Sequence, residues 1–268
     1  MGAGYATLGV LCEMESTAST RPIFLTAQWR NLAMLNYEIA PEVLALYVPR
    51  GCELDAWNGK SFISIVGFQF LSTRVYGIPI PGHRNFPEVN LRFYVRRRAA
   101  DEWRRGVVFV KELVPRRAIA WVARRLYGER YQALPMRQTV ALPEAAVPGS
   151  VAYEWKRAGI WEGLTAQFAG NPQIPADDSE EAFIAEHYWG YCRLPNGETL
   201  EYQVEHPRWR VWNLAQAALN CDVTALYGPD FGPALSRPPT SAFVAEGSEV
   251  IVRRAVNLHT SSAQRQNA

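Results

Sequence analysis

The sequence of 268 residues is poor in cysteine, and it lacks long apolar runs. Its four cysteines, Cys12, Cys52, Cys192 and Cys221, form no CxxC pair and have no regular spacing. This pattern argues against a disulfide framework or a structural zinc site, and it is typical of a reducing compartment. No stretch approaches the ~20 apolar residues that a membrane helix requires. We therefore expect a cytoplasmic protein that has no membrane span.

Lysine is also scarce, because the chain has only Lys60, Lys111 and Lys156. Lys111 lies in the apolar segment GVVFVKEL, next to Glu112. Burial there would lower the pKa of its amine, as imine chemistry requires. An ordinary lysine at a strand end explains the same position, and we favour that interpretation. Lys111 is nevertheless the one lysine that we keep as a candidate catalytic residue.

Several common signatures of enzymes are missing. The segment GAGYATLG near the start has glycine spacing but no strand before it, so it is not a dinucleotide loop. No serine stands in a GxSxG turn, and no cysteine has the neighbourhood of a nucleophile. The sequence therefore predicts no cofactor.

The ends of the chain differ from its middle. Residues 1–22 have no basic residue before Arg21, so they make a poor signal peptide, and we interpret them as a disordered leader. Residues 256–268 are interpreted as a flexible tail. The stretch from 23 to 255 shows no internal repeat and no linker. We therefore predict a single domain over residues 23–255.

Positive charge is concentrated in one segment. Residues 92–130 hold twelve Arg or Lys and four acidic residues, a balance of +8, whereas the whole chain carries +2 and the remainder −6. A basic stripe is a feature of proteins that bind nucleic acid or acidic ligands. No nucleic-acid motif accompanies the charge. We therefore favour the interpretation that these basic side chains lie on solvated turns and on one face of a helix, and we do not expect a nucleic-acid partner.

Strands dominate the expected secondary structure, and helices are few and short. We expect strands or extended segments at 23–40, 61–70, 88–95, 106–113, 131–142, 151–169 and 242–252, and a hairpin over 186–206. We expect helices from Pro41 to Val48, over 115–127, and after a cap at Asp178 or Ser179. Asn58-Gly59 predicts a tight turn. Because β-α-β alternation is absent, this pattern predicts an α+β, β-rich, largely antiparallel fold.

The segment FPEVNLRFYV is the most informative of the predicted strands. Alternation places Glu88, Asn90, Arg92 and Tyr94 on one face, and the apolar residues Val89, Leu91, Phe93 and Val95 on the other. A polar face is also typical of a strand that faces solvent. Asparagine is poor in strands, however, and an arginine fork suits a carboxylate ligand. We therefore predict that the polar face contributes to a ligand pocket.

A second candidate is the hairpin 186–206. If Asn196-Gly197 forms a two-residue turn, counting places His187 opposite His206 and Tyr191 opposite Tyr202. Two facing histidines are typical of an acid–base pair, of two metal ligands, or of a hydrogen-bonded core pair. No third ligand has diagnostic spacing, so we expect no metal.

Several segments, taken in order, resemble one known family. These segments are AQWRNLAMLNYEIAPEVLALYVPRGCELDAWNGKSFISIVGF, FPEVNLRFYV, ARRLYGERYQALPM, EHYWGYC, VEHPRW and AFVAEGSEVIV. Over about residues 23–255 the chain resembles the YqjF-like conserved proteins of unknown function, a family similar to the acetoacetate decarboxylase-like superfamily. That resemblance implies a β-cone or double-barrel fold around a central polar pocket.

The resemblance also implies roles for two residues. Decarboxylases of that superfamily have a strand whose glutamate lines the pocket, and FPE places Glu88 in the similar position. They also have a lysine pair whose first member forms an imine, and the similar segment here, LYGERYQ, has Tyr131 and Gln132 instead. A tyrosine cannot form a Schiff base, so the usual mechanism requires another lysine, such as Lys111.

Two functions remain open at this point. The first is an enzyme that acts on a small oxygenated or carboxylate compound, with Arg92 holding the carboxylate, Glu88 as acid or base, and Tyr131 or a histidine as oxyanion donor. The second is a ligand-binding or sensing module without catalysis. In both, the partner is a small molecule held in part by Asn90 and Tyr94. A homo-oligomer is compatible with either.

Overall fold

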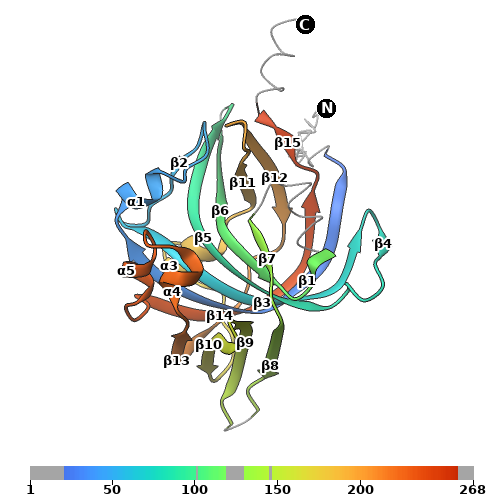
Figure 1. Ribbon diagram of the computed structural model, residues 1–268, viewed down its shortest axis with the longest axis vertical. Coiled ribbons are helices and arrows are strands. Elements are labelled where there is room, and N and C mark those ends of the chain that lie inside the picture. Colours follow the sequence, from blue (N-terminus) through green and yellow to red (C-terminus); the bar gives the residue numbers. More distant parts are fainter. Residues whose placement is uncertain (1–20, 101, 119–129, 145–146, 259–268) are drawn as a thin grey trace, which may run out of the picture.

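The computed structural model describes residues 21–100, 102–118, 130–144 and 147–258, and most of them lie in one strand-rich fold (Figure 1). The strands are β1 Ile23–Ile39, β2 Glu53–Leu54, β3 Ser61–Val75, β4 Ile78–Pro79, β5 Phe86–Ala99, β6 Glu102–Val114, β7 Tyr131–Ala133, β8 Met136–Ala141, β9 Gly149–Arg157, β10 Ile160–Phe168, β11 Trp189–Arg193, β12 Thr199–Glu205, β13 Val211–Asn220, β14 Ser241–Arg253 and β15 Val256–Asn257. The described helices are α1 Pro41–Ala45, α3 Glu180–Ala185, α4 Val223–Tyr227 and α5 Gly232–Leu235. None of these helices is long and apolar enough to cross a membrane.

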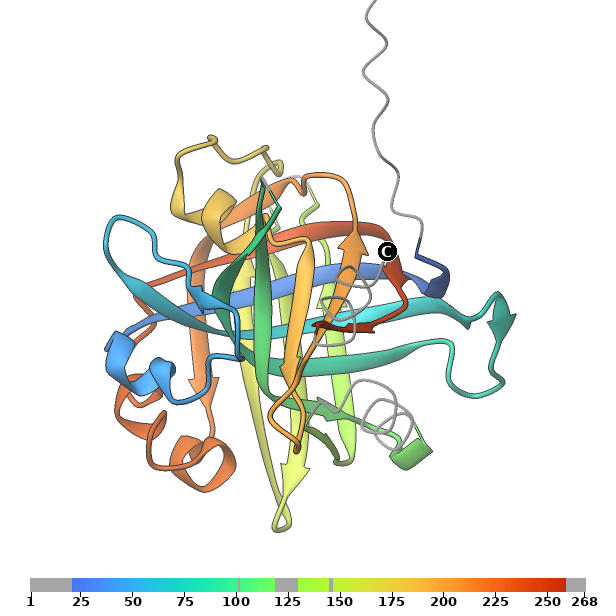
Figure 2. The same ribbon diagram turned by 90° about the horizontal axis from the view of Figure 1, so that it is seen from above.

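The strands form a strongly curved sheet around a common interior. Its order is β15-β12-β11-β6-β5-β3-β1-β14-β13-β10-β9-β8, and β12 also pairs with β14. Most of these pairs are antiparallel, and the short contacts of β6 with β7 and β11 are parallel. Helices α1, α4 and α5 gather on one side of the molecule, and β4 lies on the other (Figures 1 and 2). The predicted β-rich, largely antiparallel α+β fold is confirmed.

The two faces of β5 follow the predicted alternation. Val89, Leu91 and Phe93 are fully buried in the larger apolar core, which also includes residues of β9, β10, α4 and α5. Glu88 and Asn90 point to the other side of the sheet, where a second apolar core and a cavity lie. Because both faces are buried, β5 is a central strand, and its polar side chains do not form a solvent-facing ladder.

A β-bulge in β6 changes which residues face the interior. Arg92 pairs with Phe109, but Leu91 pairs with Lys111, so Val110 is the extra residue. Beyond the bulge, Asn90 lies opposite Glu112. The bulge therefore turns the side chain of Glu112 toward the interior and that of Lys111 away from it.

The hairpin of β11 and β12 differs from the predicted register by one residue. Trp189 pairs with Gln203, and Tyr191 pairs with Glu201 instead of Tyr202. The loop has three residues, 195–197, because the amide of Leu194 donates to the carbonyl of Glu198 and Gly197 has a φ of 81°. Glycine at the left-handed position of a three-residue loop gives this alternative to the two-residue turn. The prediction that His187 and His206 pair across the strands is wrong, because both lie outside the paired residues.

Most of the other elements are of the predicted type, but some have different bounds. Asn58 and Gly59 both have positive φ, as the predicted turn requires, and the Ser179 side chain caps α3 by accepting from the amide of Ala182. The extended segment predicted at 151–169 is in fact the hairpin β9–β10, which turns at Ala158-Gly159 with positive φ at both residues. Helix α1 ends earlier than predicted, at Ala45. The helix predicted over 115–127 falls mostly outside the described residues, as does the leader.

Candidate functional site

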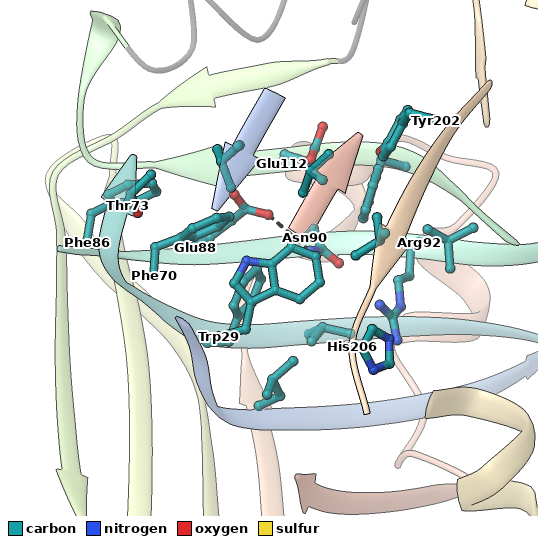
Figure 3. A pocket seen from close by; sticks show the side chains of 18 of the residues that line it. Trp29, Phe70, Thr73, Phe86, Glu88, Asn90, Arg92, Glu112, Tyr202 and His206 are labelled. Carbon is teal, nitrogen blue, oxygen red and sulfur yellow. Dashed lines mark hydrogen bonds between the residues drawn. The ribbon is translucent and has the colours of Figure 1, made fainter. Parts of the chain in front are cut away.

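A cavity of about 230 Å³ lies inside the curved sheet (Figure 3). Strands β1, β3, β5, β6, β11, β12 and β14 all contribute to its wall. Most lining side chains are apolar or aromatic, among them Trp29, Phe70, Phe86 and Phe109. The resemblance implied a polar pocket, but here the polar groups form a strip, chiefly from β5, within an apolar wall. Such a wall suits a ligand with a substantial apolar part.

Glu88, Asn90 and Tyr131 meet at one end of this strip. Asn90 Nδ2 donates to Glu88 Oε1 at 3.2 Å, and the Tyr131 hydroxyl donates to Glu88 Oε2 at 3.4 Å. Glu88 is 3% exposed, so this carboxyl group is held away from bulk solvent. The resemblance had suggested Glu88 and Tyr131 independently, and the fold brings them together from β5 and β7.

Glu112 is a cavity residue that the sequence analysis did not select. It lies opposite Asn90 on β6 and beside Tyr131 on β7, and it is 1% exposed. Its side chain points into the same cavity as that of Glu88 (Figure 3). Two buried carboxyl groups on neighbouring strands are an arrangement suited to acid–base chemistry.

Arg92 occupies the other end of the strip, and its side chain is buried. Its Nη2 donates to the Ile184 carbonyl at 3.3 Å and contacts Met34 Sδ at 3.7 Å. Its guanidinium also lies 5.7 Å from the centre of the Tyr94 ring. Within the described part of the chain, no carboxylate forms an ion pair with Arg92, and its Nε has no hydrogen-bond partner. The cavity therefore contains a buried cation without a described counter-charge.

His187 lines the cavity near Arg92 and is held from behind by Asp55. Its Nε2 lies 3.4 Å from Asp55 Oδ2, and Arg105 Nε donates to the same oxygen at 2.6 Å. Burial lowers the pKa of His187 to about 4, and the charges of Arg105 and Arg92 act in the same direction, whereas Asp55 opposes them. The imidazole is therefore neutral at pH 7.

His206 reaches the cavity from the end of β12. Its ring stacks on Trp209 at 4.1 Å between ring centres, and its Nδ1 lies 2.9 Å from the Pro207 carbonyl. Burial lowers the pKa of His206 to about 4, and the Arg92 charge contributes. Figure 3 shows His206 beside Arg92. The two predicted histidines therefore belong to one cavity with Arg92, although they are not strand partners.

Tyr94 is the predicted ligand-binding residue that does not line the cavity. Its hydroxyl is 2.6 Å from Ser64 Oγ, and its ring lies 4.7 Å from that of His187. Ser64 in turn donates to Asn36 Oδ1 at 2.6 Å. Tyr94 therefore supports His187 and Arg92 from behind.

Residues 26–249 match the family DUF2071, described as an uncharacterized conserved protein. The chain belongs to this family. A relative, the uncharacterized protein YqjF of Bacillus subtilis (strain 168), is 38% identical over 68 residues. That match spans 25% of this chain and 28% of YqjF. The predicted resemblance to YqjF-like proteins is thereby confirmed.

Several solved structures share the fold of this DUF2071 member. The enduracididine biosynthesis enzyme MppR complexed with pyruvate has a TM-score of 0.62 at 13% identity, with 96% of this chain and 98% of that chain covered. Acetoacetate decarboxylase from Legionella pneumophila subsp. pneumophila str. Philadelphia 1 gives 0.59 at 12% identity, with 96% and 98% covered. An acetoacetate decarboxylase-like enzyme from Sphingomonas wittichii RW1 gives 0.60 at 14% identity, with 92% and 97% covered. These likenesses confirm the predicted fold.

None of the chain's three lysines lines the cavity. Lys111, the predicted candidate, lies on the other side of the sheet, where its Nζ donates to the carbonyl of Leu226 in α4. Burial lowers the pKa of this amine, and the nearby charges of Arg130 and Arg157 add to the effect. The amine is thus perturbed in the predicted direction but is remote from Glu88, so we do not include Lys111 in the site.

The arginines of the basic segment take part in the fold. Arg97 and Arg104 form ion pairs with Glu201, Arg96 pairs with Glu53, and Arg105 pairs with Asp55. These pairs leave less free positive charge than the sequence balance suggests. No group of three His, Cys, Asp or Glu side chains among the described residues is placed to hold a metal ion.

Proposed function

We propose that the protein binds a small organic carboxylate with an apolar body, and that Arg92 receives the carboxylate. The observation that carries this proposal is the buried guanidinium of Arg92, which has no ion-pair partner among the described residues. A buried charge without a partner costs several kcal/mol, and a bound anion removes that cost. Guanidinium and carboxylate groups also match in geometry, because two parallel hydrogen bonds can form between them.

The rest of the cavity indicates what the carboxylate is attached to. Trp29, Phe70 and Phe86 present aromatic surface beside the polar strip (Figure 3). Aromatic walls favour an apolar or aromatic ligand body through area burial and ring contacts. We therefore favour an arylalkyl or branched aliphatic acid over a short, fully polar acid.

A fold neighbour provides independent support for a carboxylate ligand. MppR, which has a similar fold, has been solved in complex with pyruvate, itself a small carboxylate.

A second candidate function is catalysis in the same cavity. Glu88, which accepts hydrogen bonds from Asn90 and Tyr131, would act as acid or base, and Tyr131 would stabilise an oxyanion. Glu112 would be the second carboxyl group of the pair. Glu88→Gln should then abolish turnover of an identified substrate and leave its binding nearly unchanged. Turnover by this variant at the wild-type rate would leave binding as the function.

Calorimetric titration with a panel of hexanoate, phenylacetate and the neutral phenylacetamide tests the binding proposal. We expect at least one acid to bind, phenylacetamide to bind more weakly than phenylacetate, and Arg92→Gln to lose roughly 10- to 100-fold in affinity. Arg96→Gln is the matched control, because Arg96 lies on the same strand but pairs with Glu53 at the surface. Absence of binding by every acid, or equal binding by Arg92→Gln and wild type, would contradict the proposal.

A further inference from the structure

The surroundings of the two cavity histidines favour one tautomer of each ring. Asp55 Oδ2 accepts a hydrogen bond from Arg105 and lies 3.4 Å from His187 Nε2. A carboxylate only accepts hydrogen bonds, and the pKa of Asp55 is lowered by its contacts with His187 and Arg105 despite burial, so it is ionised. Both ring nitrogens of His187 are buried without a hydrogen-bond partner in the described chain, and Nε2 is the one that lies beside this carboxylate. We therefore place the proton of the neutral ring on Nε2, which leaves Nδ1 as the acceptor atom.

His206 is fixed in the opposite sense. Its Nδ1 is 2.9 Å from the Pro207 carbonyl, which can only accept a hydrogen bond. Nδ1 therefore carries the proton, and Nε2 is the acceptor atom of the ring. Stacking on Trp209 holds the plane of this ring. Each neutral ring thus keeps one acceptor nitrogen, which is fully buried in His187.

Burial beside Arg92 favours the neutral form of both rings. Burial is the main cause of the lowered pKa of each histidine, and the Arg92 charge lowers both further. A neutral histidine with its proton already donated elsewhere can accept a hydrogen bond but cannot donate one. A cationic donor, Arg92, therefore lies near two neutral acceptors in a cavity wall that is otherwise mostly apolar.

We propose that the ligand carries a hydroxyl group on the carbon next to its carboxylate, so that the site selects 2-hydroxy acids over 2-oxo acids. The carboxylate accepts from Arg92, and the hydroxyl donates to Nδ1 of His187 or Nε2 of His206. A 2-oxo group offers only acceptor lone pairs, so it would face the histidine lone pairs without a hydrogen between them. This inference rests on the proposed carboxylate site and adds the chemical class of its ligand.

Three acids of one skeleton test the inference, because phenylacetate, mandelate and benzoylformate differ only in a methylene, a hydroxymethylene or a carbonyl next to the carboxylate. In calorimetric titration at pH 7.5 we expect the better enantiomer of mandelate to bind about 3- to 10-fold more tightly than the other two acids, as one added hydrogen bond implies. Benzoylformate binding as tightly as mandelate, or more tightly, would overturn the inference.

Ring replacements locate the hydroxyl contact. His187→Phe and His206→Phe keep a ring and remove the acceptor nitrogen, so one of them should reduce the preference for mandelate over phenylacetate to below 2-fold. A preference that survives in both variants would contradict the inference. Failure of all three acids to bind, or no effect of Arg92→Gln on any of them, would instead refute the carboxylate site itself.

The tautomers of the two histidines can also be measured on the unmodified protein, so this test does not depend on whether a variant folds. Nitrogen-15 NMR of the histidine side chains at pH 7 should show a proton on Nε2 of His187 and on Nδ1 of His206. The opposite tautomer at both rings would place donors beside Arg92 and would overturn the inference. Asp55→Asn retains an oxygen that can accept from His187, so it should preserve the mandelate preference, whereas Asp55→Ala should weaken it.

Discussion

Glu88 and Arg92 lie on the same face of β5, at opposite ends of the polar strip in the cavity wall. They are four positions apart along an extended strand, which corresponds to roughly 13 Å. Glu88 interacts with Asn90 and Tyr131, whereas Arg92 lies near His187 and His206. If a ligand carboxylate binds Arg92 as proposed, the cavity leaves room for the rest of the ligand beside Asn90 and Glu88.

The unpaired charge of Arg92 predicts that the site lowers the stability of the ligand-free protein. Arg92→Met keeps the length of the side chain and removes the buried charge, so we expect the free energy of unfolding to rise by about 1–3 kcal/mol. Chemical denaturation without ligand measures this change, and Arg96→Met serves as the surface control. A loss of stability in Arg92→Met larger than in the control would show that Arg92 is needed for folding.

Glu201 presents the opposite situation, because it is fully buried and well paired. Arg21, Arg97 and Arg104 all donate to its carboxylate at 2.6–3.0 Å. Glu201→Ala leaves partly buried arginines without their shared partner, and we expect a loss of about 3–5 kcal/mol in thermal or chemical unfolding. Glu205→Ala, which removes a more exposed partner of Arg253, should cost less than 1 kcal/mol. Equal effects of the two substitutions would contradict this interpretation.

The absence of a cavity lysine predicts that keto acids do not form imines at this site. Treatment with borohydride in the presence of pyruvate should leave the mass of the protein unchanged. Burial lowers the pKa of Lys111, and its amine donates to the Leu226 carbonyl on the other side of the sheet. A reduced adduct that maps to Lys111 by peptide mass spectrometry would show that this amine reaches a carbonyl ligand.

The low pKa of His187 predicts a loss of stability in mild acid. Its value is about 4 in the folded protein against an ordinary 6.5, so the unfolded chain binds the proton first as pH falls. The stability due to the neutral ring is complete above pH 6.5 and is lost between pH 6.5 and 4. Denaturation curves for wild type and His187→Phe should diverge over this interval, with a shallower decline in the variant. Parallel declines would mean that His187 titrates normally. His206 has the same direction of shift, so His187→Phe should retain part of the decline.

Strand alternation was enough to predict which side chains of β5 share a face. Val89, Leu91 and Phe93 lie in the larger apolar core, and Glu88, Asn90 and Arg92 line the cavity, whereas Tyr94 lies behind the cavity wall. The cap at Ser179 and the turn at Asn58-Gly59 depend on neighbouring residues only, which is why they too could be predicted.

The errors in the predicted strand register each come from one extra residue, in a strand or in a loop. Without the bulge at Val110, Lys111 would face Asn90, and the cavity would contain the lysine that the sequence analysis considered. The loop before β12 has three residues instead of the predicted two, so Tyr191 pairs with Glu201 and not with Tyr202. No local pattern identifies such shifts. The contact between Asp55 and His187 joins segments far apart in sequence, and no periodicity predicts it.

A crystal structure of the protein with bound mandelate would show where the carboxylate binds. We expect both carboxylate oxygens to lie within about 3.2 Å of nitrogen atoms of Arg92, with the phenyl ring against Trp29 or Phe70. A carboxylate bound instead at the Arg97 and Arg104 surface, with Arg92 making only its contacts to Ile184 and Met34, would contradict it.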